Sequence, residues 1–478
     1  MKDKFYKIRE NVKKRIENTD NKKLSLPQNL WDLSVLILFI AFIAIRDIPI
    51  FLYAAQIFFL IMTLINIIRN KKINNIRVSF SWGAFVVWVL LSFIWASSMT
   101  NAIKFFKEII QIAIISSGFA VYCSDKNNIK KALEFAAISS VFMIFYTLVK
   151  TPIKEWITIY NTYKDIATDA GRLGYSIGVH PNTMGALCVI SIFLWGYVFK
   201  EKKIKTSILW IILSFFLLLF TKSRAAFIEL FIIGYLPIAF ANLEWKKILI
   251  RTVIYIITIL IFIGVSLNVP FLYRLYGSRF EGLSNFLKYN TTVASNEKKD
   301  DDIDNIHIKK ANTNTNTIDT EKNNSSDNKK DNIKEDPLKK GDASVTGRKA
   351  LITVGLQIIK DYTILGVGAG NYANIAYNNY GLWREVYSHT NYIEMFADLG
   401  VIGFIIYYLP RFWVLIILVK KGISKRKDSL LIFLLSFCIT YLALDFIRIT
   451  YSSEFTQLIY TICFCYILIK EGNKNNKK

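Results

Sequence analysis

Residues 206–240 read TSILWIILSFFLLLFTKSRAAFIELFIIGYLPIAF, and this stretch decides the fold class. Two apolar runs flank a four-residue polar turn, TKSR, at 221–224. A bilayer core about 30 Å thick takes about 20 apolar residues of helix to cross. The stretch therefore predicts two membrane-spanning helices joined by a tight turn at the membrane surface.

The same pattern continues through the whole 478-residue chain. Its composition is 53 % hydrophobic and 20 % charged, with a mean hydropathy of +0.33. The charges collect in short basic runs such as KEKKIK (200–205) and KKGISKRKD (420–428), which separate apolar runs. Such segregation is typical of a polytopic membrane protein, so the predicted fold class is all-α.

We expect about twelve membrane-spanning helices and one large extracellular loop that carries short amphipathic helices. Because cytoplasmic loops are enriched in Lys and Arg, the basic loops place both termini in the cytoplasm and the large loop outside. No cleavable signal peptide is expected, since the chain begins with a polar, basic stretch. The predicted spans are approximately 30–45, 48–68, 79–98, 105–123, 132–149, 182–199, 206–221, 224–241, 249–267, 391–419, 429–447 and 454–470.

These spans divide the chain into a basic cytoplasmic tail (1–29), helices one to nine (30–267), the extracellular loop (268–388), helices ten to twelve (389–470) and a second tail (471–478). The part of the loop at 289–342 is rich in Asn, Asp and Lys, and after Tyr289 it contains no Phe, Trp or Tyr. It is predicted to be disordered. Its DDIDN run and its histidine, His307, are interpreted as incidental.

The net charge of +24 does not predict nucleic-acid binding, because the positive residues lie in short loops between spans. All five cysteines fall within or at the ends of apolar spans. They are interpreted as small core residues rather than as disulfides or metal ligands. No metal site and no cofactor is predicted.

Arginines mark two of the outer turns. Arg224 opens the second helix of the quoted stretch, where Thr221 and Ser223 are candidate caps, and an anion is favoured at such a helix N-terminus. Arg172 precedes His180 in DAGRLGYSIGVHPN (169–182), where Pro181 predicts a helix start. The alternatives are an arginine that faces lipid headgroups at Arg224 and a loop or capping histidine at His180.

A third arginine, Arg348, lies in TGRKALITVGLQIIKDYTILGVGAGNY (346–372). A helix over 346–361 would put Lys349, Thr353, Gln357 and Lys360 on a polar stripe. Arg348 would line up with Ile352, Gly355 and Ile359 on the apolar face, which predicts an interfacial helix. Arginine at a helix N-terminus suits a phosphate, although a headgroup contact is the alternative. GVGAGNY is interpreted as a tight turn, because the strand and helix of a dinucleotide fingerprint are missing.

His389 stands in SHTNYIEMFADLGVIG (388–403), where a polar segment becomes an apolar helix. If Ser388 caps that helix, Glu394 and Asp398 lie about 140° and 180° around it from the histidine. These carboxylates are therefore not expected to orient the imidazole. An ordinary imidazole titrates near pH 6.5 and can act as a base at neutral pH, the alternative being an interface histidine without chemistry.

Arginines and one base suit transfer of a group from a lipid diphosphate to an alcohol. The diphosphate leaves readily once its charge is neutralised, and the attacking hydroxyl needs a base. In order, the segments GRLG with HPN, TKSR, TGRKALITVGLQIIKDYTILGVGAGNY and SHTNYIEMFADLGVIGF resemble the O-antigen ligase/polymerase family over about 169–405. That superfamily also contains capsular polysaccharide polymerases and some protein O-oligosaccharyltransferases.

The resemblance implies an inverting, metal-independent glycosyl transfer from an undecaprenyl-diphosphate-linked glycan. It implies that His389 is the base, that Arg348 and Arg224 bind the diphosphate and that Arg172 is a weaker third. The usual His-Asn pair reads His-Thr-Asn here, which displaces Asn391 by one position.

Three functions remain open within these constraints. The Lys-, Asn- and Ile-rich composition is typical of an AT-rich genome, common among Gram-positive bacteria, which lack the lipid A core that an O-antigen ligase needs. This favours a polymerase of capsular or cell-surface polysaccharide repeat units, with a flippase and a chain-length regulator as possible partners. The alternatives are a glycan ligase acting on lipid or protein, and a transporter, for which Glu229 and Asp445 would be the charges within the membrane.

Overall fold

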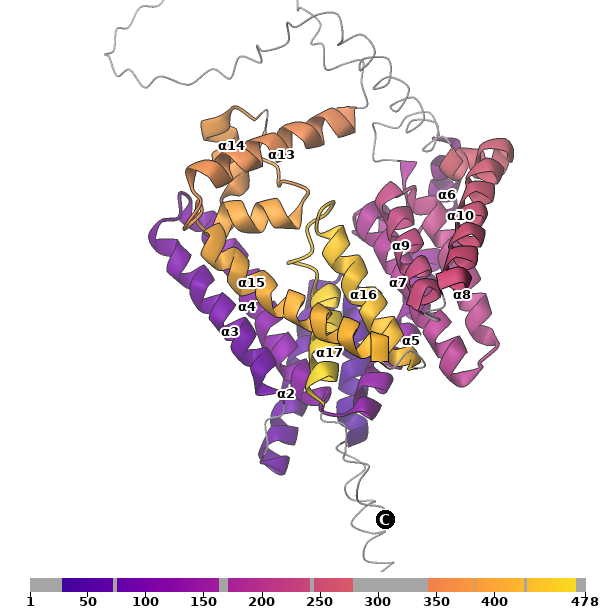
Figure 1. Ribbon diagram of the computed structural model, residues 1–478, viewed down its shortest axis with the longest axis horizontal. Helices are drawn as coiled ribbons and strands as arrows, with labels where there is room; N and C mark the ends of the chain where they lie inside the picture. The colour runs from indigo at the N-terminus through magenta and orange to yellow at the C-terminus, as the bar shows by residue number, and fades with distance from the viewer. Residues whose placement is uncertain are drawn as a thin grey trace, which may run out of the picture. The chain divides into compact units, whose positions relative to one another are not determined.

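The computed structural model describes residues 28–71, 75–162, 171–240, 245–277, 343–382, 384–424 and 428–469 (Figure 1). These ranges contain helices and turns and no β-strand, which confirms the all-α prediction. The insert predicted to be disordered at 289–342, with DDIDN and His307, lies outside the described residues, as do the C-terminal tail and nearly all of the N-terminal one.

A helix covers each of the twelve predicted spans. The first is Gln28–Ile43. The others are α2 (Pro49–Asn70), α3 (Ile76–Leu91), α4 (Met99–Tyr122), α5 (Lys126–Lys150), α7 (Pro181–Lys202), α8 (Thr206–Thr221), α9 (Arg224–Phe240), α10 (Trp245–Asn268), α15 (Asn391–Ser424), α16 (Ser429–Leu444) and α17 (Glu454–Leu468). Shorter helices are η1 (Ser92–Ile94), α6 (Ile153–Asn161), η3 (Tyr175–Ile177), α11 (Pro270–Leu272), η4 (Tyr273–Gly277), α13 (Ala343–Asp361) and α14 (Tyr372–Tyr380).

Seven of the described helices are long and apolar enough to cross a membrane, so the chain is a multi-pass membrane protein. They are α2, α3 with η1, α4, α5, α7, α10 and α15. Four shorter apolar helices, Gln28–Ile43, α8, α16 and α17, have 15 or 16 residues. The total of twelve crossings and the side on which the termini lie stay predictions.

The chain forms two compact units. The first comprises 1–87, 107–279 and 406–478, and its centre is α7, which packs against α5, α8, α9 and α16 (Figure 1). Small residues permit this: a Cβ on Gly185 of α7 would lie 2.7 Å from the Cβ of Ala226 on α9. In contrast, no residue in the apolar window of α10 is buried, so that helix faces outward from its unit.

The five cysteines, Cys123, Cys188, Cys438, Cys463 and Cys465, are buried and unbonded to one another. This confirms their interpretation as core residues.

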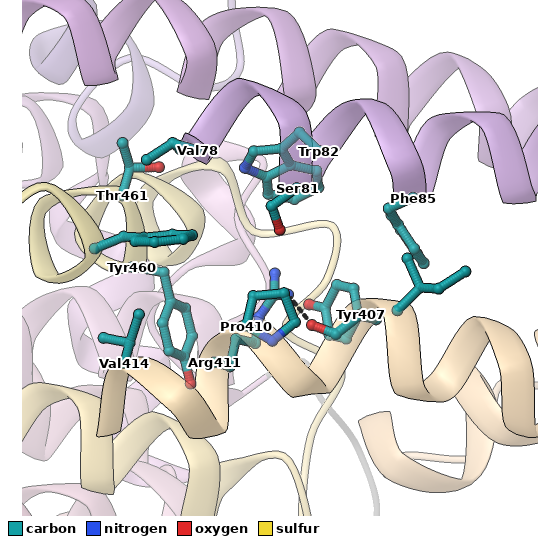
Figure 2. Close-up of a pocket in the computed structure, with 12 residues that line it drawn as sticks. Val78, Ser81, Trp82, Phe85, Tyr407, Pro410, Arg411, Val414, Tyr460 and Thr461 are labelled. Atoms are coloured by element: carbon teal, nitrogen blue, oxygen red, sulfur yellow. Dashed lines mark hydrogen bonds between the residues drawn. The ribbon is translucent and has the colours of Figure 1, made fainter. Parts of the chain in front are cut away.

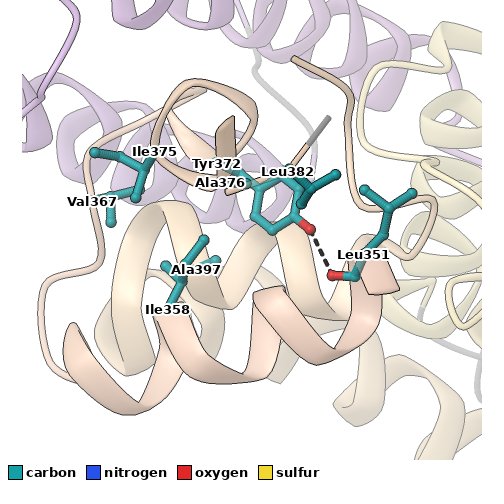
Figure 3. Close-up of a cluster of buried hydrophobic side chains, with 8 residues drawn as sticks. All are labelled: Leu351, Ile358, Val367, Tyr372, Ile375, Ala376, Leu382 and Ala397. Atoms are coloured by element: carbon teal, nitrogen blue, oxygen red, sulfur yellow. Dashed lines mark hydrogen bonds between the residues drawn. The ribbon is translucent and has the colours of Figure 1, made fainter. Parts of the chain in front are cut away.

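The second unit comprises 88–106 and 280–405. Its described part contains α13, α14 and the beginning of α15, and Figure 3 shows the buried cluster that joins these helices. Tyr372 lies in this cluster, where its hydroxyl donates a 2.7 Å hydrogen bond to the Leu351 carbonyl oxygen. Burial, followed by the nearby Glu394 and Asp398 carboxylates, raises the pKa of Tyr372 well above its ordinary value, so the phenol stays a donor. The cluster consists of Leu351, Ile358, Val367, Tyr372, Ile375, Ala376, Leu382 and Ala397.

Candidate active site

In the first unit, the first two arginine segments meet at the junction of α7, α8 and α9. The guanidinium of Arg172 donates from Nε to the Thr221 carbonyl oxygen at 3.0 Å and from Nη2 to Asn182 Oδ1 at 2.7 Å. Ser223 Oγ donates to the same Asn182 oxygen at 2.9 Å. Asn182 therefore ties the GRLG loop to the TKSR turn, a link that its place beside Pro181 did not reveal.

Arg224 is the first residue of α9, as predicted, and its side chain is partly exposed. Ser223 caps the helix, because its Oγ accepts from the Ala226 N–H at 3.3 Å. The neighbouring hydroxyl of Tyr276 donates to the Ser223 carbonyl oxygen at 3.3 Å. These contacts fix the backbone from which Arg224 projects.

The other basic residue of the turn, Lys222, points into the protein. It is only 3 % exposed and occupies the left-handed region, with φ of 50°. Its Nζ donates to the carbonyl oxygens of Ile159 at 2.5 Å and Thr162 at 3.3 Å, which terminate α6. Lys222 is thus a structural cation, which sequence reasoning missed because its partners lie about 60 residues away.

His180 acts as a helix cap. Its Nδ1 accepts a 3.2 Å hydrogen bond from the Asn182 N–H, and α7 begins at Pro181. The capping interpretation of His180 and the predicted helix start are confirmed.

In the second unit, His389 lies before α15 and not inside it. The helix begins at Asn391, and His389 has a φ of +61°. Its ring lies against that of Tyr387, with centroids 4.3 Å apart, and the side chain is half-buried. The prediction that a helix capped by Ser388 contains His389 is therefore wrong, and the angles that separated Glu394 and Asp398 from it do not apply.

Glu394 instead contacts the segment that carries the histidine. Its Oε2 accepts from the Ser388 N–H at 2.8 Å and from Ser388 Oγ at 3.0 Å. The Ser388 oxygen also accepts from the Thr390 N–H at 3.2 Å. Ser388, Thr390 and Glu394 are all buried. The Glu394 carboxylate on the first turn of α15 thus holds Ser388, and Ser388 in turn holds Thr390 on the other side of His389.

Asp398 likewise accepts hydrogen bonds from backbone N–H groups, in this case those of the GVGAGNY loop. Its two carboxylate oxygens accept from the N–H groups of Tyr372 at 2.7 Å and Gly370 at 3.0 Å, and the residue is fully buried. The loop contains three glycines with positive φ, Gly366, Gly368 and Gly370. The turn interpretation holds, and the turn is one that packs against α15.

The predicted continuous span over 391–419 is wrong at Gly400, where φ of 66° and ψ of −175° interrupt α15. Only glycine adopts this conformation readily, and a Cβ there would lie 2.1 Å from the Ile364 carbonyl oxygen. Polar backbone groups freed by the break find new partners. The Ala397 and Asp398 carbonyl oxygens accept from the Val367 and Gly368 N–H groups at 2.9 Å, and the Val401 N–H donates to the Thr363 carbonyl oxygen at 2.9 Å.

Arg348 lies near the start of α13, which begins at Ala343, three residues earlier than predicted, and ends at Asp361 as predicted. Arg348 is exposed, as is Ile352, which is 38 % exposed. Gly355 is buried, and a Cβ there would lie 2.3 Å from Ile393 Cγ2. The predicted stripe of Arg348, Ile352 and Gly355 is therefore split, because Leu351, Gly355 and Ile358 face the core. The exposed side continues to Leu356, which is 56 % exposed.

A separate cavity of about 30 Å³ lies in the first unit between α3, α15 and α17 (Figure 2). Arg411 lines it and is 9 % exposed. Its Nη2 donates to Gln457 Oε1 at 2.7 Å, and its guanidinium lies 3.5 Å from the ring centroid of Tyr407. Amide and aromatic groups thus compensate the buried charge. None of the predicted site residues lines this cavity.

The two acidic residues that suggested a transporter have partners within the first unit. Glu229 Oε2 lies 3.2 Å from Arg448 Nη1. Asp445 Oδ2 accepts from the Tyr408 hydroxyl at 2.9 Å, and Thr450 also donates to this carboxylate. Both have a structural use.

The candidate site residues therefore fall into two groups. Arg172 and Arg224 belong to the first unit, and Arg348 and His389 belong to the second. Residues 208–408, which include three of these four, match the family model described as O-antigen ligase. This match confirms the resemblance that the motifs indicated. A comparison with curated proteins gave no match.

Proposed function

We propose, from the premise that residues 208–408 form an O-antigen ligase domain, that this membrane enzyme polymerises undecaprenyl-diphosphate-linked oligosaccharide repeat units for a capsular or cell-surface polysaccharide. The reaction takes place at the outer face of the cell membrane, and both termini are cytoplasmic. The domain itself indicates glycan transfer from a lipid carrier. The fixed position of His389 just before α15 supports glycan transfer by a single base, and the Lys-, Asn- and Ile-rich composition favours a polymerase over a ligase.

In the proposed reaction, the imidazole of His389 accepts the proton of the acceptor sugar hydroxyl. The acceptor oxygen forms a bond to the anomeric carbon of the donor as the bond from that carbon to the diphosphate oxygen breaks. Attack opposite the leaving group inverts the anomeric configuration, as in the family that the chain resembles. The electron pair leaves with the lipid diphosphate, and the proton stays on the imidazole until it passes to solvent.

Arg348 and Arg224 are proposed to neutralise the departing diphosphate. Arg348 is exposed near the N-terminus of α13, and Arg224 is the first residue of α9. The helix N-terminus favours an anion beside Arg224 alone, because Arg348 is the sixth residue of α13; both guanidinium groups can bind phosphate oxygens in pairs. Arg172 is a weaker third candidate, because two of its donors already bind Thr221 and Asn182. No metal or cofactor is part of the proposal.

The test is reconstitution of the purified protein in liposomes with a lipid-diphosphate repeat unit as the only glycan. A polymerase lengthens chains that remain on the lipid diphosphate, and mild acid then releases them. A ligase needs a separate lipid or protein acceptor and gives no growth here. We expect growth with wild type and none with His389→Ala, and strongly reduced growth with Arg348→Ala. Unchanged growth with both variants would refute the proposed site.

Two further proposals follow from polymerisation. The repeat unit has to reach the outer face, so a flippase is an expected partner, and a chain-length regulator is a second.

A transporter remains the alternative of another class, and it predicts movement of lipid-linked glycan across the bilayer without new glycosidic bonds. Pairing of Glu229 with Arg448 favours the enzyme, because it gives a buried acid a structural use.

A further inference from the structure

The backbone of His389 is in an unfavourable conformation. Other non-glycine residues with positive φ include Lys71, Lys203 and Lys222, which end helices, where a left-handed residue is common. His389 has φ of +61° and, like Asn75 before α3, stands ahead of a helix instead. Such a conformation persists only when surrounding contacts hold it, and it is found most often at functional sites.

The residues on both sides of His389 are linked through Ser388, which binds the Glu394 carboxylate and also contacts Thr390, with its hydroxyl 2.7 Å from the Thr390 carbonyl oxygen. Before it, the Ser388 N–H and hydroxyl reach Glu394 Oε2 at 2.8 and 3.0 Å. After it, the Thr390 N–H donates to Ser388 Oγ at 3.2 Å, and the Thr390 carbonyl oxygen accepts from the Glu394 N–H at 3.1 Å. Hydrogen bonds thus link Ser388, Thr390 and Glu394 to one another, and His389 lies in the turn between Ser388 and Thr390.

We infer that Glu394 is a positioning residue for His389. It acts through Ser388, whose buried N–H it satisfies, and so keeps the left-handed bend that presents the imidazole. Without an acceptor at this place the Ser388 N–H would be buried and unpaired, which destabilises the bend relative to ordinary φ values. This inference rests on the proposed function, in which His389 is the base.

The substitution Glu394→Gln separates positioning from acid–base chemistry. The amide oxygen of glutamine still accepts the Ser388 N–H, but the side chain is no longer a carboxylate. We expect Glu394→Gln to retain most of the transfer rate, within about threefold of wild type, and Glu394→Ala to lose about 10- to 100-fold in kcat, the loss that an unpaired buried donor implies. KM for the lipid-linked donor should stay unchanged in both, because Glu394 is buried and the proposed diphosphate ligands are Arg348 and Arg224.

A spectroscopic readout makes the test independent of turnover. The chain has three histidines, so imidazole 13C–1H signals of labelled protein in detergent can be assigned with His180→Asn and His389→Asn. We expect Glu394→Ala to shift the His389 signal and leave the His180 signal in place, and Glu394→Gln to restore the wild-type position. Glu385→Ala is the matched control, since Glu385 is a nearby exposed acid on the same segment, and it should change neither signal nor rate.

The outcomes separate this inference from the function on which it rests. Full activity of His389→Ala would refute the proposed base. Loss of activity in His389→Ala together with a wild-type rate and spectrum in Glu394→Ala would overturn the positioning role alone. Equal loss in Glu394→Ala and Glu394→Gln would show that the carboxylate is required and would also overturn it. If Glu394→Ala does not fold, Ser388→Ala, which removes the hydroxyl contacts with Glu394 and Thr390 but keeps the Ser388 N–H bond to Glu394, is expected to shift the His389 signal by a smaller amount.

Discussion

Candidate site residues lie at the N-terminal ends of two helices, α9 and α15. The charged side chains that bind the backbone at these two ends have opposite signs. Before α9, cations donate to backbone carbonyls: Arg172 to Thr221, and Lys222 to Ile159 and Thr162. Around the beginning of α15, carboxylates accept from backbone N–H groups: Glu394 from Ser388, and Asp398 from Gly370 and Tyr372. These charged residues therefore satisfy the backbone, whereas Arg348, on α13, is exposed.

The largest effect on stability is expected where a carboxylate holds two buried donors. Asp398→Ala leaves the N–H groups of Gly370 and Tyr372 without their acceptor, at about 1–3 kcal/mol for each buried donor. We expect a fall of about 2–6 kcal/mol in the free energy of unfolding, measured as a lower melting temperature in detergent. Asp361→Asn is the control, because Asp361 is exposed and the amide oxygen can still accept from the Tyr380 hydroxyl, so the cost should be less than about 0.5 kcal/mol. An unchanged melting temperature in Asp398→Ala would show that this carboxylate does not stabilise the backbone near the start of α15.

A smaller effect is expected for the cation that holds the other junction. Arg172→Ala loses hydrogen bonds to Thr221 and Asn182, and because the side chain is partly exposed we expect about 1–3 kcal/mol. Transfer activity should fall in parallel with the melting temperature, and Arg172→Lys should recover part of both. The exposed Arg69 at the end of α2 provides the control variant, Arg69→Ala. Lost activity at full stability would instead make Arg172 a substrate ligand.

Arg348→Ala is expected to have the smallest effect on stability, below about 0.5 kcal/mol, because Arg348 is exposed. Loss of one charge-assisted contact to the diphosphate should raise KM for the lipid-linked donor by about 10- to 100-fold. Lys349 is the next residue and is also exposed, but it is not a proposed diphosphate ligand. Lys349→Ala should therefore leave KM for the donor within about twofold of wild type. Steady-state kinetics at varied donor concentration measure both. A lower melting temperature of Arg348→Ala together with an unchanged KM would show that Arg348 stabilises the fold and does not bind the donor.

Much of the fold could be predicted because hydrophobic segregation is a local signal. A helix was found at each of the twelve expected segments, and the caps at Ser223 and His180 followed from residue types at helix starts. The break at Gly400 could not be predicted in the same way. A glycine in an apolar run is tolerated inside a helix, and only the packing of residues 363–370 against it supplies the replacement hydrogen bonds.

The candidate site was predicted as a set of residues but not as a set of contacts. His389 was recognisable at the switch from polar to apolar sequence, yet its φ is positive, the helix begins only at Asn391, and Glu394 binds the preceding Ser388. The helical geometry that placed Glu394 on a remote face assumed a helix that began at His389, two residues before its observed start at Asn391. Lys222 was missed for a related reason, because its burial depends on the end of α6.

The most direct measurement is the rate of glycosidic bond formation by purified protein in liposomes, compared between wild type and His389→Ala at saturating donor. Removal of a general base costs about 10²- to 10⁴-fold. We expect a loss in that range, with the melting temperature unchanged and the new linkage inverted relative to the donor. A His389→Ala rate within about threefold of wild type, or a retained anomeric configuration, would contradict transfer from a lipid diphosphate by a single histidine base.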